Sequence, residues 1–561
     1  MLRTVRAGLV LVTLGVALMG ERAEACGCFA PPSAIDNVVQ AGERILFAVK
    51  NGTVTAHVQI QYSGSAQDFG WLLPLPSVPT LKLGTDELFT ELNRTTVPTY
   101  ASTTVFACDR GGGGGGFGCA PAVFASSNRS IGGEDLQDAG VSVVVTRSSI
   151  GPYEYAVLRA DDRNEMLNWL NANRYFVPTG TDSAVNPYIR PGAYFLALKL
   201  RAGAQTKDIT PVVLQYQATY PMIPLILTSV GATPNMGVQV WVLGDARAVP
   251  RNFHHVVLND AQLDWANGVP NYVDVVTRAV AEAPGKHAFI TEYAGSSAPM
   301  RDVLAPPSRF GTEAEFAAAT TPQDFLRLIY SSNFTTGGAL PSPVVRILET
   351  QLPVPSTLSI SADEFYSRAD YYFGEYRQMS PSAFDNYPAF DAQVLAAELF
   401  SKFVTPVREA DALFDEFPKL TRFFTTLSPE DMTVDPVFGF NPDLPDVSPA
   451  HAATLTVKCE GPVITTEQGW QTPQSPRELT PPLTDVPAAL RVEVLGEEGA
   501  PSVITDNTET ISARLTRVSD PIAEPMKQGC AVVDPLSLGL LLLMARLRRR
   551  GTLSSRAASL R

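Results

Sequence analysis

The sequence predicts an α+β fold, with a strand-rich N-terminal region that carries inserted helices, a helical middle region and an extended C-terminal tether. Apolar and polar residues alternate in short runs as far as about residue 245, which is the period of half-buried strands. Helix-start patterns then appear between residues 321 and 417. The 561 residues include 45 prolines and 41 glycines, which favour turns over long helices.

A hairpin is the clearest element near the start. Arg44 to Lys50 is the first strand, Asn51-Gly52 is the turn preferred in two-residue hairpins, and Thr53 to Tyr62 returns. His57 alternates with the apolar residues of the returning strand, so we expect its side chain on the polar face, in a solvent-facing or cross-strand polar role. Further strands are expected at Asp68–Pro76, Val141–Thr146, Tyr153–Leu158, Ala193–Leu200, Val212–Gln217, Ile223–Leu227 and Val238–Leu243, and helices at Asp86–Leu92 and Asp161–Asn173.

The middle of the chain carries helix signals. Thr321-Pro322 is a helix start, and Ser361 to Glu364 is a capping box. A helix from Phe390 toward Val404 should break or kink at Pro406, and a second helix follows. The later strands are expected at Thr454–Lys458 and Leu490–Val494. The predicted divisions are 1–25, 26–350, 351–450, 451–495, a linker at 496–529 and a terminal segment at 530–561.

The first 25 residues have the three parts of an export signal. Arg3 and Arg6 precede an apolar core from Leu9 to Met19, and Ala23-Glu24-Ala25 is a small-x-small cleavage pattern. We therefore expect signal peptidase to cut after Ala25 and to leave Cys26 at the new amino terminus. Lipidation of Cys26 is the alternative fate.

The other end carries a second short apolar stretch, residues 535–545, which follows Cys530 and precedes four arginines within residues 546–550. Positive charge after such a stretch stays on the cytoplasmic side, which leaves the rest of the chain outside. This tail resembles the myxobacterial carboxy-terminal sorting signals. The resemblance implies that a membrane protease cuts at Cys530 and that the protein is then anchored in the cell envelope.

Charge and cysteine content narrow the possible partners. The formal net charge of −14 argues against nucleic-acid binding, which needs basic patches. Six cysteines fit an oxidising compartment. Cys108 and Cys119 bracket a glycine run, and a disulfide between them would close that loop. Zinc is the rival interpretation for Cys26-Gly27-Cys28.

Three segments resemble an uncharacterised bacterial family, domain of unknown function 2330 (DUF2330). They are Glu43 to Phe47, Thr55 to Tyr62, and Phe69 to Pro76. The resemblance extends from residue 26 to about 350. It implies an exported protein with a cysteine-rich mature end, and it carries over no activity, cofactor or catalytic residue.

Catalytic motifs do not stand out in the sequence. It has neither the His-Glu-x-x-His of zinc proteases nor a Gly-x-Ser-x-Gly elbow. His254 and His255 are adjacent and would point to opposite faces of a strand. His57 has a second interpretation as a base or ligand on a rigid sheet. We predict no cofactor, and the sequence favours a non-catalytic protein.

One acidic, proline-broken loop is a candidate for a Ca²⁺ site. Asp435, Asn441, Asp443 and Asp446 offer side-chain oxygens there. Asp and Asn also gather in such loops because they form turns. We therefore expect an exported, envelope-anchored protein with a structural or binding role. The alternatives are a secreted hydrolase with an unrecognised site and a Ca²⁺-dependent adhesive module.

Overall fold

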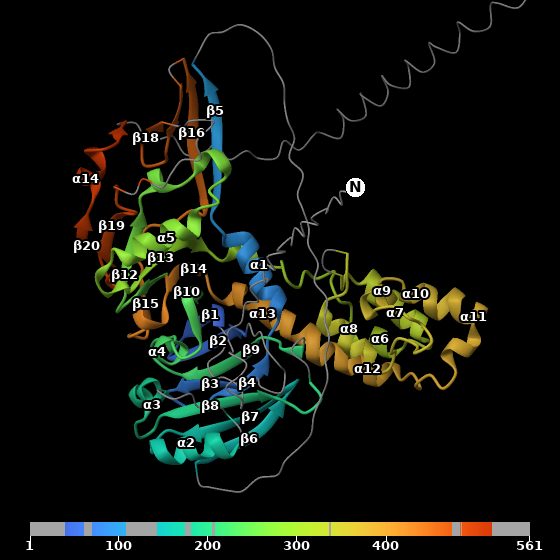
Figure 1. Cartoon of the computed structure of the whole chain (residues 1–561). Helices are drawn as coiled ribbons and strands as arrows, with labels where there is room; N and C mark the ends of the chain where they lie inside the picture. The colour runs from blue at the N-terminus through green and yellow to red at the C-terminus, as the bar shows by residue number, and fades with distance from the viewer. Residues whose placement is uncertain are drawn as a thin grey trace, which may run out of the picture.

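A ten-stranded mixed sheet runs through the body and positions the other elements (Figure 1). The computed structural model describes residues 40–60, 70–107, 143–173, 175, 181–204, 208–335, 338–459, 461–473, 483 and 485–518. In spatial order the strands are β20 (Ser502–Asp506), β19 (Ala489–Val494), β12 (His254–Leu258), β13 (Ala288–Ser296), β14 (Lys419–Leu427), β10 (Ala232–Gly244), β1 (Gln40–Lys50), β2 (Thr53–Gln59), β9 (Val212–Gln217) and β4 (Thr80–Leu83).

Three smaller sheets accompany the large one. A four-stranded sheet contains β3 (Gly70–Leu75), β8 (Tyr194–Leu200), β7 (Tyr153–Arg159) and β6 (Val144–Ile150). A five-stranded sheet contains β21 (Thr516–Arg517), β18 (Trp470–Pro473), β17 (Gly461–Thr465), β16 (Ala450–Lys458) and β5 (Thr99–Phe106). The pair β11 (Arg247–Pro250) and β15 (Phe438–Asn441) forms the smallest sheet.

Helices gather mainly in a separate lobe beside the large sheet (Figure 1). Those of the N-terminal half are α1 (Asp86–Thr96), α2 (Arg163–Ala172), α3 (Thr181–Val185), α4 (Leu225–Thr228) and α5 (Tyr272–Ala281). The lobe contains α6 (Glu313–Ala317), α7 (Pro322–Ser331), α8 (Ser342–Glu349), α9 (Ala362–Ser367), α10 (Ala369–Tyr371), α11 (Arg377–Met379), α12 (Ala392–Leu399) and α13 (Thr405–Glu416), and α14 (Thr508–Ser512) lies near the far end of the large sheet. The mixed α+β class predicted from the sequence is confirmed.

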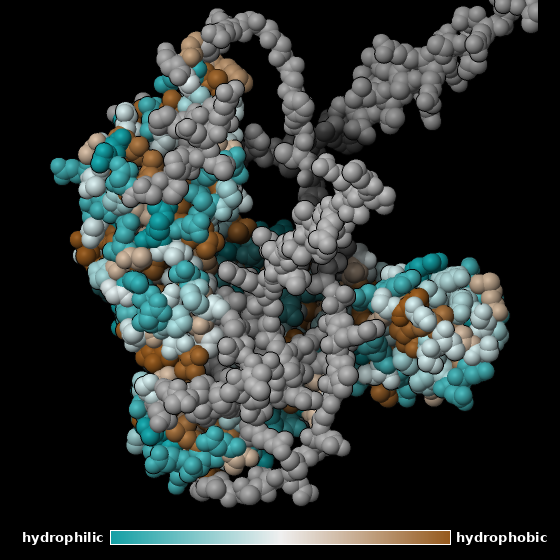
Figure 2. Space-filling view, viewed as in Figure 1, coloured by the Kyte–Doolittle hydropathy of each residue, from teal (hydrophilic) through white to brown (hydrophobic). Residues whose placement is uncertain are grey.

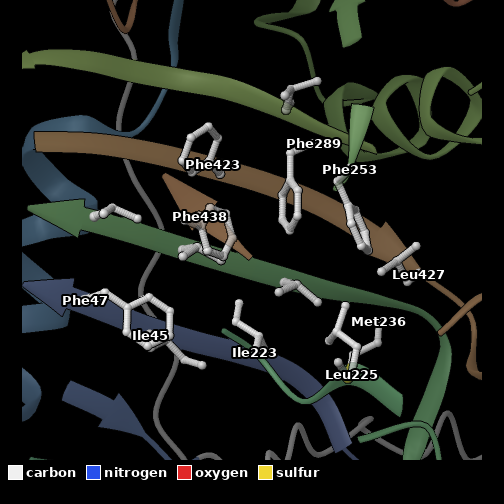
Figure 3. Packing of buried hydrophobic residues seen from close by; sticks show 14 of the residues in the cluster. Ile45, Phe47, Ile223, Leu225, Met236, Phe253, Phe289, Phe423, Leu427 and Phe438 are labelled. Carbon is white, nitrogen blue, oxygen red and sulfur yellow. The ribbon is translucent and has the colours of Figure 1, made fainter. Parts of the chain in front are cut away.

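Both faces of the central strands of the large sheet are buried. Side chains alternate between the two faces along each strand, and each face packs in its own apolar cluster. On one face, Ile45 and Phe47 of β1 belong to the same apolar cluster as Phe423 of β14 (Figure 3). On the other face, Leu46 packs in a second cluster with α1 and the helical lobe. The sheet is thus a central layer, and polar side chains on its faces are enclosed.

Local signals placed several elements correctly. The predicted hairpin is formed by β1 and β2, with Asn51 at φ 52° and Gly52 at φ 72°, as its two-residue turn requires. The predicted helix start is also present, because the Thr321 side chain accepts a hydrogen bond from the Asp324 N–H at the start of α7. These features depend on neighbouring residues alone, which is why the sequence was sufficient to predict them.

The expected strand at Ile223–Leu227 is wrong. This segment forms the short helix α4 after Pro224, and Ile223 and Leu225 are buried in the main apolar cluster. Pro221 and Pro224 have no N–H to donate to a strand partner, so the apolar run does not pair as a strand. Of the two outcomes expected at Pro406, a break or a kink, the break is absent, because the helix does not end there. A π-helical turn at Phe400–Val404 precedes it, and α13 continues beyond it.

Two predicted boundaries also differ from the fold. β14 lies between β13 and β10, so residues of the expected helical division complete the large sheet. The expected linker begins too early, because β20 pairs with β19 and β21 pairs with β18. Both short strands lie within residues 496–518, which pack on the body. A tether is therefore wrong for this part of the predicted linker, and residues 519–529 lie outside the described ranges.

Candidate functional site

A buried ion pair lies at the centre of the large sheet. Arg422 occupies the middle of β14, and its Nε pairs with Oε2 of Glu292 on the neighbouring strand β13. Both residues are 4% exposed. The pairing of β13 with β14 shifts register between Thr291 and Tyr293, so Glu292 sits at a bulge. A bulge redirects a side chain, and here the carboxylate meets the guanidinium.

Gln239 and Tyr272 are hydrogen-bonded to this ion pair. Nη2 of Arg422 donates to Oε1 of Gln239 at 2.9 Å, and the Gln239 amide donates to the Phe423 carbonyl at 2.6 Å. The Tyr272 hydroxyl, at the start of α5, donates to Oε1 of Glu292 at 2.6 Å. Each carboxylate oxygen of Glu292 therefore accepts a hydrogen bond, which a buried charge requires to be tolerated.

The C-terminal end of α1 closes one side of the ion pair. Nη1 of Arg422 donates to the Thr96 hydroxyl at 3.2 Å, and the Trp241 indole N–H donates to the same oxygen at 3.0 Å. The guanidinium also lies 5.3 Å from the Trp241 ring centre. A cation over an aromatic face is attracted by the ring electrons. We call Gln239, Tyr272, Glu292, Arg422 and Thr96 the polar network.

Aromatic rings extend this network toward the surface. Tyr100 of β5 lies 5.7 Å from Tyr272 between ring centres, and it stacks on His451 of β16 at 5.0 Å. His451 Nδ1 in turn lies 2.8 Å from Oε2 of Glu467. Burial, with the nearby charge of Glu292, raises the pKa of Tyr272 well above its usual 10. Tyr272 therefore remains protonated and acts as a hydrogen-bond donor.

A second polar group lies across β1 and β2, toward the N-terminal end of α1. Arg44 is in register with Gln239 of the network. Its Nη1 donates to Gln59 at 3.3 Å, and the Gln59 amide donates to Asp86 at 2.8 Å. Burial raises the pKa of Asp86, although the Gln59 hydrogen bond opposes this. Together with the polar network, these residues form a polar row across one face of the sheet.

His57 is buried, and its expected solvent-facing position is wrong. The side chain is 4% exposed, and Nδ1 has no hydrogen-bond partner among the described residues. Burial, and secondarily the charge of Lys82, lowers the pKa of His57 to about 4. The alternation placed His57 correctly opposite the apolar residues of β2, but helices cover that face as well. In the described ranges, no nucleophilic hydroxyl or thiol is hydrogen-bonded to Nδ1 of His57.

The burial of His57 predicts acid sensitivity. Its pKa is about 6.5 when exposed in the unfolded chain and about 4 in the folded protein, so the unfolded chain binds the proton first as the pH falls. The contribution of neutral His57 to the free energy of unfolding is fully present above pH 6.5. It falls as the pH drops toward 4, by on the order of 3 kcal/mol in total. We expect His57→Gln to remove that part of the loss. Urea unfolding at a series of pH values measures it, and equal pH slopes for both proteins would contradict the assignment.

The acidic side chains of the predicted Ca²⁺ loop are hydrogen-bonded or ion-paired to other residues of the protein. Asp435 accepts hydrogen bonds from the Tyr188 hydroxyl at 2.7 Å and from the Ile226 N–H at 2.9 Å. Asp446 pairs with Lys419 at 2.7 Å. These partners tie the loop to α4 and to β14.

The other two loop residues hold the chain near residue 499. The Asn441 amide donates to the carbonyls of Gly496 and Gly499 at 2.7 and 3.0 Å. A carboxylate oxygen of Asp443 accepts from the Gly499 N–H at 2.7 Å. Among the described residues, no group of three or more His, Cys, Asp or Glu side chains is placed to hold a metal ion.

Glu43, in one of the segments that carry the family resemblance, is a buried carboxyl group. It is 9% exposed, and its Oε2 has no hydrogen-bond partner in the described part of the chain. Burial, with the charge of Asp435 nearby, raises the pKa of Glu43 to about 8. The group is therefore mostly protonated at neutral pH, which lowers the cost of enclosing it.

The remaining predicted positions are accounted for as follows. His254 and His255 lie in β12 with different partners, the His287 carbonyl and Glu493, which agrees with opposite faces.

Within the described ranges, none of the helices has the length and apolar character needed to cross a bilayer. Five predicted processing or disulfide positions lie outside these ranges, namely Ala25, Cys26, Cys108, Cys119 and Cys530.

Comparison with known proteins identifies the family. Residues 22–329 match a family described as an uncharacterized protein conserved in bacteria, DUF2330, and this match covers more than half of the chain. The chain belongs to the DUF2330 family. No curated protein and no solved structure matches it. The DUF2330 match includes Gln239, Tyr272 and Glu292 but ends before Arg422, so the polar network joins the family region to the sequence that follows it.

The polar network was not found from the sequence. Its members come from α1, α5, β10, β13 and β14, and the contact between Thr96 and Arg422 joins residues 326 positions apart. The available signal was a charged residue within a strand that also carries large apolar residues, as Arg422 is beside Phe423. That signal marks a buried polar residue without identifying its partner.

Proposed function

We propose that this DUF2330 protein is exported and held at the bacterial cell envelope, where it has a structural or binding role. The observation that carries the proposal is the pair of short apolar segments flanked by arginines. Leu9 to Met19 follows Arg3 and Arg6, whereas residues 535–545 precede the arginine cluster. Opposite charge placement directs the first segment to export and holds the second at the inner membrane, with residues 26–529 outside the cytoplasm.

Fractionation of cells that produce the tagged chain tests the export step. We expect wild type in the envelope fraction, with a mass that lacks residues 1–25. Leu14→Arg places a charge in the apolar core of the signal and should leave an uncut precursor in the cytoplasm. A wild-type protein that keeps residues 1–25 and stays in the cytoplasm would overturn the proposal.

The anchoring step has its own test. If Cys530 directs cleavage and anchoring, Cys530→Ala should change the mass or release the protein from the envelope fraction, while cleavage after Ala25 continues. Cys119→Ala is the matched control, because it removes a different cysteine without touching the tail. Unchanged mass and location for Cys530→Ala would eliminate this sorting step and leave the export proposal intact.

Cys459, at the end of β16, supports an oxidising location because it is disulfide-bonded. We expect a thiol reagent to leave Cys459 unlabelled in the purified protein and to label it after reduction. Reduction should lower the free energy of unfolding by about 2–4 kcal/mol. Peptide mass spectrometry and urea unfolding measure the two effects. Full labelling of Cys459 without reductant would remove this support.

A further inference from the structure

The outer edge of β5 is unusual among the edge strands of the described sheets. β5 has eight residues, Thr99 to Phe106, and none of them is charged or a proline. Edge strands normally carry such residues because they discourage pairing with another chain. Every other edge strand of the described sheets except the mostly buried β15 has at least one: Asp506 in β20, Lys82 in β4, Pro74 in β3, Arg147 in β6, Arg517 in β21 and Arg247 in β11.

β5 is also open to solvent. All of its residues except Tyr100 are exposed, and its one strand partner among the described residues is β16. The two strands project from the body, and apolar residues gather at their tip (Figures 1 and 2). Val105 is 46% exposed and Phe106 76% exposed. An apolar tip and an uncharged edge together present a surface that another strand would cover.

The hydrogen bonds to β16 show which backbone groups of β5 remain available. The N–H groups of Thr99 and Ala107 donate to carbonyls at Pro449 and Val457, so the odd-numbered residues face β16. Successive residues of a strand point their N–H and C=O groups to opposite edges. The even-numbered residues, Tyr100, Ser102, Thr104 and Phe106, therefore turn these groups to the free edge.

We propose that β5 pairs with β5 of a second copy of this chain, antiparallel and about a two-fold axis at Thr103. In this register Tyr100 lies opposite the second copy's Phe106, and Ser102 lies opposite its Thr104. All four outward-facing residues then exchange backbone hydrogen bonds. A register centred on Ser102 leaves Phe106 without such a partner. The axis at Thr103 therefore pairs more of the backbone groups on the free edge.

The side chains of β5 fit this self-pairing. Aromatic pairs and pairs of Ser or Thr across antiparallel strands are stabilising. The exposed Phe106 gains a neighbour in Tyr100 of the second copy, on the face where Trp265 already packs edge-on to Tyr100. No like charges meet along the strand, although the whole chain is acidic. A symmetric, isologous contact of this kind closes as a dimer.

This inference concerns the folded body and does not depend on export. Sedimentation of the purified full chain over a range of concentrations tests it, with two matched variants. Ser102→Glu with Thr104→Glu places Glu opposite Glu across the axis, and we expect dimerisation at least tenfold weaker. Ser102→Glu with Thr104→Lys places Glu opposite Lys and should restore the dimer. A monomeric wild type, or equal dimerisation of both variants, would overturn the proposal.

A cross-link provides a second readout of the register. Thr103 lies opposite itself as a non-hydrogen-bonded pair, where Cα atoms are ~4.5 Å apart, within the range of a disulfide. Thr103→Cys should form a covalent dimer when diamide oxidises the two thiols. Thr505→Cys, on the exposed edge strand β20, is the control and should remain a monomer on a non-reducing gel. Equal cross-linking of the two variants would place the contact elsewhere.

Discussion

Arg422→Met is expected to lower the free energy of unfolding by about 3–5 kcal/mol, because it leaves the carboxylate of Glu292 buried without its counter-charge. Glu292 is 4% exposed and lies at the bulge of β13, so water does not replace the guanidinium there. Met has a length similar to Arg and keeps most of the packing against Trp241. Urea unfolding at pH 7 measures the loss.

Two further variants separate the ion pair from general packing effects. Arg422→Met combined with Glu292→Leu removes both charges, and we expect it to recover most of the loss, since breaking a buried pair costs more than replacing it. Lys402→Met breaks the exposed pair with Glu398, whose side chains are 47% and 31% exposed, and should cost less than about 1 kcal/mol. Similar losses for Arg422→Met and Lys402→Met would mean that Glu292 reaches solvent.

The hairpin and His57 show what period-two alternation can and cannot predict. Alternation in residues 53–62 correctly separated the two sets of side chains in β2, and Asn51-Gly52 correctly marked the turn. The pattern did not reveal that the polar set is also covered. The cover comes from α1 and the helical lobe. It buries His57, whereas Thr53, Thr55 and Gln59 are half-buried.

The polar network illustrates a different limit. Arg422, Glu292 and Gln239 each lie close to large apolar residues in the sequence of their strands. Their pairing depends on the order of strands in the sheet, where β14 enters between β13 and β10. Local patterns do not determine that order. The acidic loop is predictable in part. The Asn441 side chain accepts a hydrogen bond from the Asp443 N–H, which is the local turn that its residue type favours. The long-range bonds from Asn441 and Asp443 to the backbone near Gly499 have no local signal.

The second large effect is expected for Phe423→Ala, with a loss of about 3–5 kcal/mol from the cavity that it creates. Phe423 is fully buried on the face of β14 opposite Arg422. Its ring centre lies 5.9 Å from that of Phe289 and 5.5 Å from that of Phe438, so three strands contribute to one aromatic contact (Figure 3). The same unfolding measurement at pH 7 gives the loss.

This prediction also tests whether the family region is complete without the sequence that follows it. β14 lies beyond residue 329, yet it supplies Phe423 to the apolar face and Arg422 to the polar face of the same sheet. Met379→Ala is the control, because that side chain is 66% exposed and its loss should change stability by less than about 0.5 kcal/mol. If Phe423→Ala were as mild as Met379→Ala, residues 22–329 would form their core without β14. If it is severe, the two parts of the chain fold as one cooperative unit, because the central strand of the sheet belongs to both of its packed faces.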